Sequence, residues 1–216
     1  MDKLEAHIEQ LREDFTKGVL TEHDVNADPF AQFRTWLQQA VDAKVHEVQA
    51  MNLATVSKEG RPSSRTVYLR EFESNGFWFY TNYESKKAQD LQSNPNACLT
   101  FFWPELERQI RIEGRVEKAT AERSDNYYNA RPYESKIGAW ASNQSHHLLS
   151  REELEQKVNE LKARFSPDTI LRPDFWGGFV LKADYYEFWQ GRKSRLHDRI
   201  SYSFKQEHWV ISRLAP

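Results

Sequence analysis

From Met51 onward, short runs of β-branched and aromatic residues alternate with tight turns, and this pattern limits the fold more than any other feature. MNLATVS, the turn KEGRP and SSRTVYLREF together predict a β-hairpin. Ser74-Asn75-Gly76 predicts a second turn before FWFYTN. Further strands are expected at ACLTFFW, ERQIRIEGRVEKA, GGFVLKADYYEFWQ, RISYSFK and HWVISRL. Strands joined mostly by short turns predict a mainly β fold, an antiparallel barrel or sandwich with helices packed outside.

Two helices are expected before the first strand. The apolar stripe of the first is formed by Leu4, Ile8, Leu11 and Phe15. Gly18 would end it. The second helix should begin after Asp28 as N-cap, with Pro29 in its first turn. Its core face is expected to consist of Phe30, Phe33, Leu37 and Val41.

Three more helical regions are expected between the strands. ESKKAQDLQSNP predicts a short helix that Asn94-Pro95 closes. A helical region over about 121–142 should be interrupted at Arg131-Pro132. Ser150 with Glu153 forms a capping box that would open a helix to about Phe165. We therefore expect one domain over 1–216, with an N-terminal helical segment at about 1–46.

Composition excludes several classes of protein. The chain has 216 residues, 30 basic and 32 acidic, so its net charge of −2 argues against a general nucleic-acid binder. No segment approaches 18 consecutive apolar residues, and the charged N-terminus is unlike a signal peptide, so a cytoplasmic protein without a membrane anchor is expected. The one cysteine, Cys98, is expected in the core of a strand. His146 and His147 lack a third ligand at a suitable spacing, so no metal site is expected.

Cationic side chains recur in four clusters that could bind anions. FWQGRKSRLHDR, residues 188–199, combines aromatics, a glycine turn, four cations and a histidine. The other clusters contain Arg65 with Arg70, Lys86 with Lys87, and Arg131 near Tyr127 and Ser135. Any single cluster can be ordinary surface charge. An arginine inside an apolar strand, such as Arg65, is the better candidate, because a buried guanidinium needs an anionic partner.

Taken together, these clusters predict one or two planar, phosphorylated ligands. Gln109 and Gln144 could form hydrogen bonds with the rim of a ring that alternates donors and acceptors, although without further support ordinary exposed polarity is the better explanation for them. No G-x-G-x-x-G or GxxxxGK[ST] motif is present, and no nucleophile with an adjacent base is indicated.

Several long motifs, in the same order, resemble the pyridoxine/pyridoxamine 5′-phosphate oxidase family. They include TKGVL, FYTN, LERQIRIEG, the RP and SKIGAW elements, WGGF, EFWQG, RLHDR and the terminal RLAP. The resemblance covers nearly the whole chain. It implies a split β-barrel that binds flavin mononucleotide (FMN) and works as a homodimer with its sites at the subunit interface. The implied reaction, in vitamin B6 metabolism, oxidises pyridoxamine or pyridoxine phosphate to pyridoxal phosphate, with hydride transfer to the flavin, which molecular oxygen reoxidises to give hydrogen peroxide.

The resemblance also implies roles for individual residues. The FMN contacts would be Arg65, Thr66, Val67, Tyr68, Leu69, Arg70, Tyr80, Thr81, Lys86, Lys87, Gln109, Gln144, Ser145, Trp189 and Arg199. The substrate contacts would be Arg12, Phe15, Arg70, Tyr127, Arg131, Ser135, Arg195, Leu196 and His197, with Arg195 and His197 as the catalytic pair.

Three positions depart from the pattern of that family. Arg70 stands where lysine is usual, Lys86 where arginine is common, and Phe15 where a tyrosine is often found. A guanidinium fork and an ammonium point donor are not interchangeable, and Phe15 lacks a hydroxyl. Two alternatives stay open: a flavin- or pyridoxal-phosphate-binding protein without turnover, and a related flavin reductase with another donor. RLHDR argues against both, because flavin binding alone does not require it.

Overall fold

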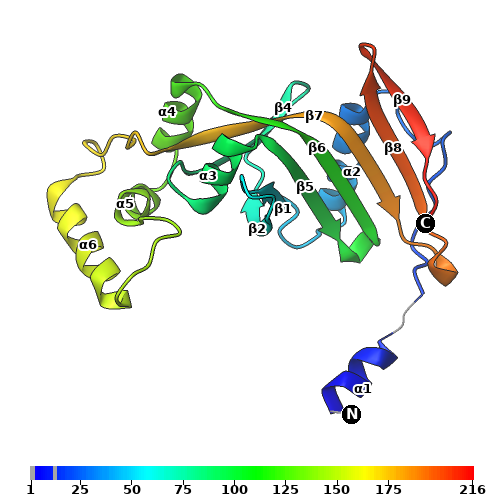
Figure 1. The fold of residues 1–216 in the computed structure, drawn as a ribbon, viewed down its shortest axis with the longest axis horizontal. Coiled ribbons are helices and arrows are strands. Elements are labelled where there is room, and N and C mark those ends of the chain that lie inside the picture. Colours follow the sequence, from blue (N-terminus) through cyan, green and yellow to red (C-terminus); the bar gives the residue numbers. More distant parts are fainter. Residues whose placement is uncertain (1–2, 12–13) are drawn as a thin grey trace. The chain divides into compact units, whose positions relative to one another are not determined.

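The structure, a computed structural model, describes residues 3–11 and 14–216 (Figure 1). Contacts within the chain group it into two compact units. Unit 1 comprises Met1–Val48, Thr100–Ile112 and Tyr185–Pro216, and unit 2 comprises Gln49–Leu99 and Glu113–Asp184. Each unit is described by itself. A single domain over the whole chain stays a prediction.

The strands join in one nine-stranded sheet in the order β2-β1-β5-β6-β7-β4-β3, with β8 pairing with β7 and β9. Their bounds are β1 Ala50–Val56, β2 Pro62–Tyr68, β3 Glu71–Glu73, β4 Gly76–Asn82, β5 Asn96–Trp103, β6 Arg108–Lys118, β7 Trp176–Gln190, β8 Asp198–Lys205 and β9 His208–Arg213. The β1–β2, β3–β4, β4–β7, β7–β8 and β8–β9 pairs are antiparallel. The expected strands are therefore confirmed, except that the one expected at SSRTVYLREF is divided into β2 and β3 at Leu69-Arg70.

In unit 2, the expected β1–β2 hairpin forms with Ala50 opposite Tyr68 and Val56 opposite Pro62. Gly60 adopts a positive φ of 78° in its turn, which explains a glycine there. The helices of this unit are α3 Lys86–Ser93, α4 Ala121–Asn129, α5 Tyr133–Ala141 and α6 Arg151–Arg164. The break at Arg131-Pro132 and the Ser150 cap, which accepts the Glu153 N–H, are confirmed. In Figure 1, α5 and α6 lie side by side.

In unit 1, helices α1 Lys3–Gln10 and α2 Pro29–Asp42 precede the sheet, and short 3-10 turns lie at η1 Pro104–Leu106 and η2 Lys193–Arg195. The predicted Asp28 cap is confirmed, since its carboxylate accepts the N–H groups of Phe30 and Ala31. Strands β8 and β9 form a hairpin, drawn in orange and red in Figure 1. None of the helices within residues 3–11 and 14–216 has the length and apolar character needed to cross a bilayer.

The buried face of α2 differs from the predicted one. Phe33 is buried as expected, but Trp36 and Ala40 accompany it, and Val41 is 49% exposed. Phe33 packs on Phe101, with ring centroids 5.5 Å apart, and Trp36 packs edge-on to Phe188 at 5.2 Å. The helix is thus rotated toward aromatic partners that are distant in the sequence.

Two other expectations need correction. The first helix ends at Gln10, before Phe15, and Leu4, Ile8 and Leu11 are exposed, so the predicted stripe does not face a core. Cys98 lies on β5 as expected but is only partly buried, because strand alternation gives the core face to Ala97, Leu99 and Phe101.

Candidate functional site

Unit 2 contains a cavity of about 640 Å³ that we call the cationic cavity. Arg65, Arg70, Lys87 and Arg131 bring four positive charges to it, and no carboxylate is among the described residues that line it. Its full lining is Arg65, Thr66, Val67, Tyr68, Arg70, Tyr80, Thr81, Lys87, Tyr127, Ala130, Arg131, Pro132, Ser135, Gln144 and Trp176. Such a lining favours an anionic ligand.

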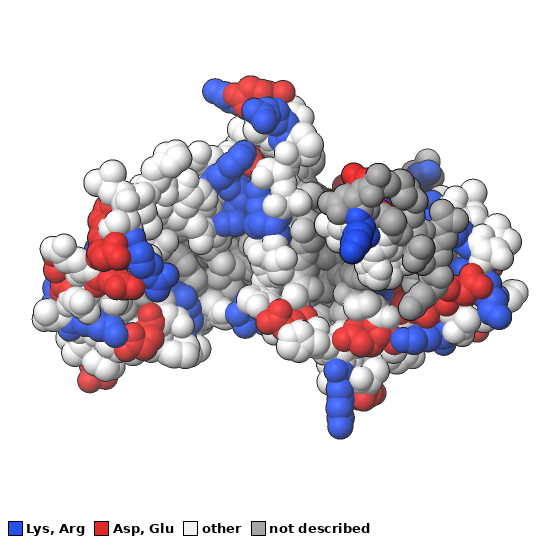
Figure 2. Space-filling view, turned by 90° about the horizontal axis from the view of Figure 1, so that it is seen from below, with Lys and Arg blue, Asp and Glu red and all other residues white. Residues whose placement is uncertain are grey.

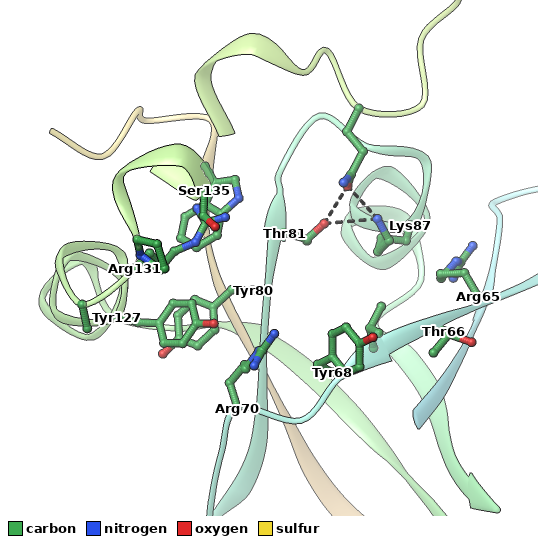
Figure 3. A pocket seen from close by; sticks show the side chains of 15 residues that line it. Arg65, Thr66, Tyr68, Arg70, Tyr80, Thr81, Lys87, Tyr127, Arg131 and Ser135 are labelled. Atoms are coloured by element: carbon green, nitrogen blue, oxygen red, sulfur yellow. Dashed lines mark hydrogen bonds between the residues drawn. The ribbon is translucent and has the colours of Figure 1, made fainter. Parts of the chain in front are cut away.

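One side of the cationic cavity is organised around Lys87, near the start of α3. Its Nζ donates to Gln144 Oε1 at 2.7 Å and to Thr81 Oγ1 at 3.1 Å, and Thr81 Oγ1 donates to the same Gln144 oxygen at 2.8 Å (Figure 3). Gln144 therefore has its oxygen occupied, which leaves its amide N–H groups as donors. Burial, together with the charge of Arg65, lowers the pKa of Lys87 to about 8.

Arg65 is held on β2 by neighbours behind the cavity wall. It donates to Thr55 Oγ1 at 2.7 Å and lies 4.0 Å from Asp90. Asp90 is 5% exposed and also pairs with Lys86 at 3.1 Å. The carboxylate of Asp90 thus orients two cations, although Lys86 itself does not line the cavity.

The other side consists of stacked aromatic rings and Arg131. Tyr80 and Tyr127 stack with centroids 3.7 Å apart, and Trp176 lies parallel to Tyr80 at 5.8 Å. The guanidinium of Arg131 lies 4.5 Å above the Trp176 ring. Its Nη1 is buried without a hydrogen-bond partner, and burial lowers the pKa of the group from its ordinary value. An arginine keeps its charge in proteins, so this donor is available to an anion.

Arg131 and Ser135 lie on the opposite side of the cationic cavity from Arg65 and Lys87 in Figure 3. Arg70, whose guanidinium lies 4.9 Å from the centre of the Tyr68 ring, completes the lining. The cations of the cationic cavity therefore form two groups, one near α3 and one near α4 and α5. They can bind two phosphates or other anionic substituents, on one ligand or on two.

Unit 1 contains a second cavity, of about 770 Å³, that we call the histidine cavity. It is lined by Leu11, Asp14, Phe15, Arg192, Ser194, Arg195 and His197. The Arg192 N–H donates to His197 Nδ1 at 3.1 Å. Desolvation, followed by the charge of Arg195, lowers the pKa of His197 from its ordinary value. In its neutral form His197 thus carries its proton on Nε2 and can donate it to a ligand.

The remaining predicted cation of unit 1, Arg199, is engaged on β8. Its Nε and Nη2 donate to the buried Glu187 at 2.9 and 3.1 Å, and its Nη1 donates to the Ala215 carbonyl at 2.8 Å. Hydrogen bonding to Glu187 raises the pKa of Arg199. Arg111 also donates to Glu187, at 3.0 Å.

The predicted site residues therefore fall into two sets, one in each unit. The cationic cavity brings together Arg65, Thr66, Val67, Tyr68, Arg70, Tyr80, Thr81, Lys87, Tyr127, Arg131, Ser135 and Gln144. Leu69, Lys86 and Ser145 lie in unit 2 but do not line it, and Leu69 is buried. Phe15, Arg195 and His197 line the histidine cavity, whereas Gln109, Trp189, Leu196 and Arg199 belong to unit 1 without lining it. Arg12 lies outside the described residues.

Sequence reasoning missed the residues that support these side chains. Trp176 opens the WGGF motif but had no assigned role, and Asp90 follows Lys86 at the i,i+4 spacing of a helical ion pair. Both signals were present. Asp198 was also overlooked; burial alone would raise its pKa, but hydrogen bonds from the Leu20 N–H, Arg213 and Arg192 outweigh burial and lower it.

Positive charge is concentrated locally in this chain. On the face drawn in Figure 2, Lys and Arg side chains gather in one patch near the middle, whereas both signs are interspersed over much of the rest. Local concentration reconciles anion binding with a net charge of −2.

Two family models match the chain. Residues 37–165 match the family model described as pyridoxamine 5′-phosphate oxidase. Residues 176–216 match the model described as the pyridoxine 5′-phosphate oxidase C-terminal dimerisation region.

Curated relatives are similar over nearly their full length. The chain is 50% identical to the pyridoxine/pyridoxamine 5′-phosphate oxidase of Actinobacillus pleuropneumoniae, over 97% of this chain and 99% of the relative. It is 48% identical to that of Haemophilus influenzae, over 99% of this chain and 100% of the relative.

Among solved structures, PhzG from Burkholderia lata, in complex with tetrahydrophenazine-1-carboxylic acid, superposes with a TM-score of 0.85 at 30% identity, covering 92% of this chain and 98% of that one. A pyridoxamine 5′-phosphate oxidase-related, FMN-binding protein from Nostoc punctiforme shares the fold, with a TM-score of 0.70 at 19% identity, covering 85% of this chain and 97% of that one. The expected fold class, mainly β with helices, is confirmed. By sequence over nearly its whole length, the chain belongs to the pyridoxine/pyridoxamine 5′-phosphate oxidase family.

Proposed function

We propose that this protein oxidises pyridoxamine 5′-phosphate and pyridoxine 5′-phosphate to pyridoxal 5′-phosphate with FMN as cofactor. The observation that carries the proposal is the cationic cavity, with four positive charges and a buried Arg131 nitrogen that lacks a partner. Relatives about 50% identical over nearly their full length, named as these oxidases, support the same reaction.

The residues of the cationic cavity fit a phosphorylated flavin. Arg65 and Lys87 would hold its phosphate, helped by Lys86 and Ser145 from outside the lining. Tyr80, Thr81 and the free amide N–H groups of Gln144 offer polar contacts to a ring rim. When bound, FMN supplies the hydride acceptor and passes the electrons to molecular oxygen, which yields hydrogen peroxide.

The second cationic group would receive the substrate phosphate. Arg131 would donate its unpartnered Nη1, while Arg70, Tyr127 and Ser135 would add further contacts. Arg195 would stabilise the anionic side of the substrate, and His197 would donate from Nε2 and orient the pyridine ring. Positioning of this kind, rather than a strong acid or base, is the contribution that hydride transfer requires of the protein.

The proposed assembly is a homodimer. The match of residues 176–216 to a dimerisation region supports it. The family resemblance, and not the lining of the cationic cavity, is the basis for six further proposed contacts. They are FMN contacts by Gln109, Trp189 and Arg199, and substrate contacts by Arg12, Phe15 and Leu196.

The alternative is a non-catalytic flavin- or pyridoxal-phosphate-binding protein. The two are distinguished by purifying the protein, measuring bound flavin by its absorbance, and adding pyridoxamine phosphate under air. We expect pyridoxal phosphate and hydrogen peroxide in equal amounts. A flavin-loaded protein that forms neither product would reject the oxidase and favour the alternative.

Two substitutions separate the proposed roles. Arg195→Ala should lower turnover strongly while flavin stays bound, because Arg195 is assigned to the substrate. Arg65→Ala should weaken flavin retention, because Arg65 and Lys87 are the cations near α3 that are proposed to bind the flavin phosphate. Loss of flavin from the Arg195 variant would contradict the assignment.

A further inference from the structure

Glu107 is a buried carboxylate at the turn between β5 and β6. It is 8% exposed, and its backbone adopts a left-handed conformation with φ 53° and ψ 41°. Its Oε2 accepts the N–H of Thr16 at 2.7 Å and the N–H of Lys17 at 2.8 Å. Burial of a carboxylate is unfavourable unless it is hydrogen-bonded, so these two backbone donors and Glu107 depend on one another.

The segment that supplies these donors, residues 14–20, is called the strap below. Two further contacts fix it within unit 1: Lys17 Nζ donates to the Glu105 carbonyl at 2.8 Å, and the Leu20 N–H donates to Asp198 Oδ2 at 3.1 Å. A Cβ at Gly18 would lie 2.7 Å from Gln190 Oε1. Gln190 is fully buried, so the strap is in close contact with the end of β7.

The strap carries one wall of the histidine cavity. Phe15 packs edge-on to both Trp189 and His197, with centroids 5.6 Å apart in each pair. Asp14 accepts the Ser194 N–H at 3.2 Å, across the same cavity. Phe15 immediately precedes the two residues that Glu107 holds, so displacement of the Glu107 anchor must displace Phe15.

The turn itself is tied to the chain that leads into the cavity. The Glu107 carbonyl accepts the Gly191 N–H at 2.8 Å and Gln190 Nε2 at 3.2 Å. A Cβ at Gly191 would lie 2.6 Å from Phe15. Glu107 thus connects the strap to the residues that precede Arg192–His197 with both its side chain and its backbone.

We propose that Glu107 is a positioning residue for substrate binding: its carboxylate holds the strap so that Phe15 closes the cavity of Arg195 and His197. The expected change in KM rests on the proposed function, whereas the placement of the strap rests on the hydrogen bonds alone. Glu107→Ala should raise KM for pyridoxamine phosphate about tenfold, with little change in kcat and flavin content, since the two charge-assisted hydrogen bonds that hold the strap are lost.

The structural consequence is measured without any activity, by hydrogen exchange of the Thr16 and Lys17 amides. Both should be protected in the unaltered protein and should exchange faster in Glu107→Ala. Glu105→Ala is the matched control, because the exposed Glu105 side chain accepts the His46 N–H, at 3.3 Å, and the Glu105 backbone carbonyl that accepts Lys17 Nζ is kept. It should change neither exchange nor KM.

A double-mutant cycle with Phe15→Ala tests the route of the effect. If Glu107 acts by placing Phe15, the double variant should have the KM of Phe15→Ala alone. Gly18→Ala displaces the strap from its own side and should reproduce the kinetic change. If Glu107→Ala does not fold, Gly18→Ala and Glu107→Gln replace it in the same measurements.

Three results would overturn the inference: slow exchange at Thr16 and Lys17 in Glu107→Ala, fast exchange with an unchanged KM, or additive effects of Glu107→Ala and Phe15→Ala. If the unaltered protein shows no turnover, the proposed function fails instead. In that case the dissociation constant of pyridoxal phosphate replaces KM, and the same comparisons decide the role of Glu107.

Discussion

At the scale of single residues, the cations of the cationic cavity differ in whether a neighbouring carboxylate balances their charge. Arg65 has Asp90 at 4.0 Å, whereas the guanidinium of Arg131 lies over the Trp176 ring and has an unpartnered Nη1. Lys87 donates to neutral oxygens. A bound anion should therefore interact most favourably with Arg131 and Lys87, and these two residues give the clearest predictions.

Arg131→Ala should raise KM for the substrate phosphate ester by roughly 10- to 100-fold, because a charge-assisted hydrogen bond is lost. Flavin content should be unchanged, since Arg131 belongs to the group near α4 and α5. Steady-state kinetics and flavin absorbance measure the two effects. Arg115→Ala, an exposed arginine on β6, is the control and should leave KM unaltered. Loss of flavin in the Arg131 variant would assign this residue to the cofactor.

Lys87 should make FMN affinity dependent on pH. Its pKa of about 8 in the ligand-free protein means that the ammonium loses its proton as the pH rises above 8. Only the charged form attracts the phosphate, which stays doubly charged over this range, so the FMN dissociation constant should rise between about pH 8 and 10. Quenching of FMN fluorescence measures it. Lys87→Arg keeps its charge and should flatten the profile; a sloping profile in that variant would assign the effect to another group.

At the scale of elements, two glycines in unit 2 have opposite surroundings. A Cβ at Gly114 on β6 would lie 2.0 Å from the Lys182 carbonyl of β7, whereas a Cβ at Gly138 in α5 would meet nothing within 4 Å. Gly114→Ala should destabilise the protein by several kcal/mol because strand backbone must move. Gly138→Ala should stabilise it by about 0.5–1 kcal/mol, since alanine is the better helix former. Urea titration measures both; a stable Gly114 variant would contradict the close strand packing.

Elements also show what sequence alone can predict. Strand positions, the Asp28 cap and the Arg131-Pro132 break depend on local turn and cap chemistry, and all were predictable. The buried face of α2 was not, because two overlapping apolar stripes exist and distant Phe101 and Phe188 select between them. Likewise Arg65 and Lys87 could be proposed from their motifs, but the support from Asp90 requires the helix to bring Asp90 back to β2.

At the scale of the whole molecule, two compact units share strands. β5, β6 and β7 each pass from one unit into the other, so neither unit can unfold without breaking strands that belong to its neighbour. The ligand-free protein should therefore unfold in one cooperative transition. Calorimetry tests this expectation, since two separated transitions would show that the units are independent domains.

Addition of FMN should move that single transition to higher temperature. A ligand at 100 times its dissociation constant stabilises the folded state by about 2.7 kcal/mol, which for a chain of this length corresponds to roughly 5–10 °C. Riboflavin lacks the phosphate that Arg65 and Lys87 are proposed to bind, so at the same concentration it should shift the transition much less. Arg65→Ala should reduce the difference between the two ligands. Equal shifts by FMN and riboflavin in the unaltered protein would mean that the cationic cavity does not bind the flavin phosphate, and the assignment of its cations would have to be revised.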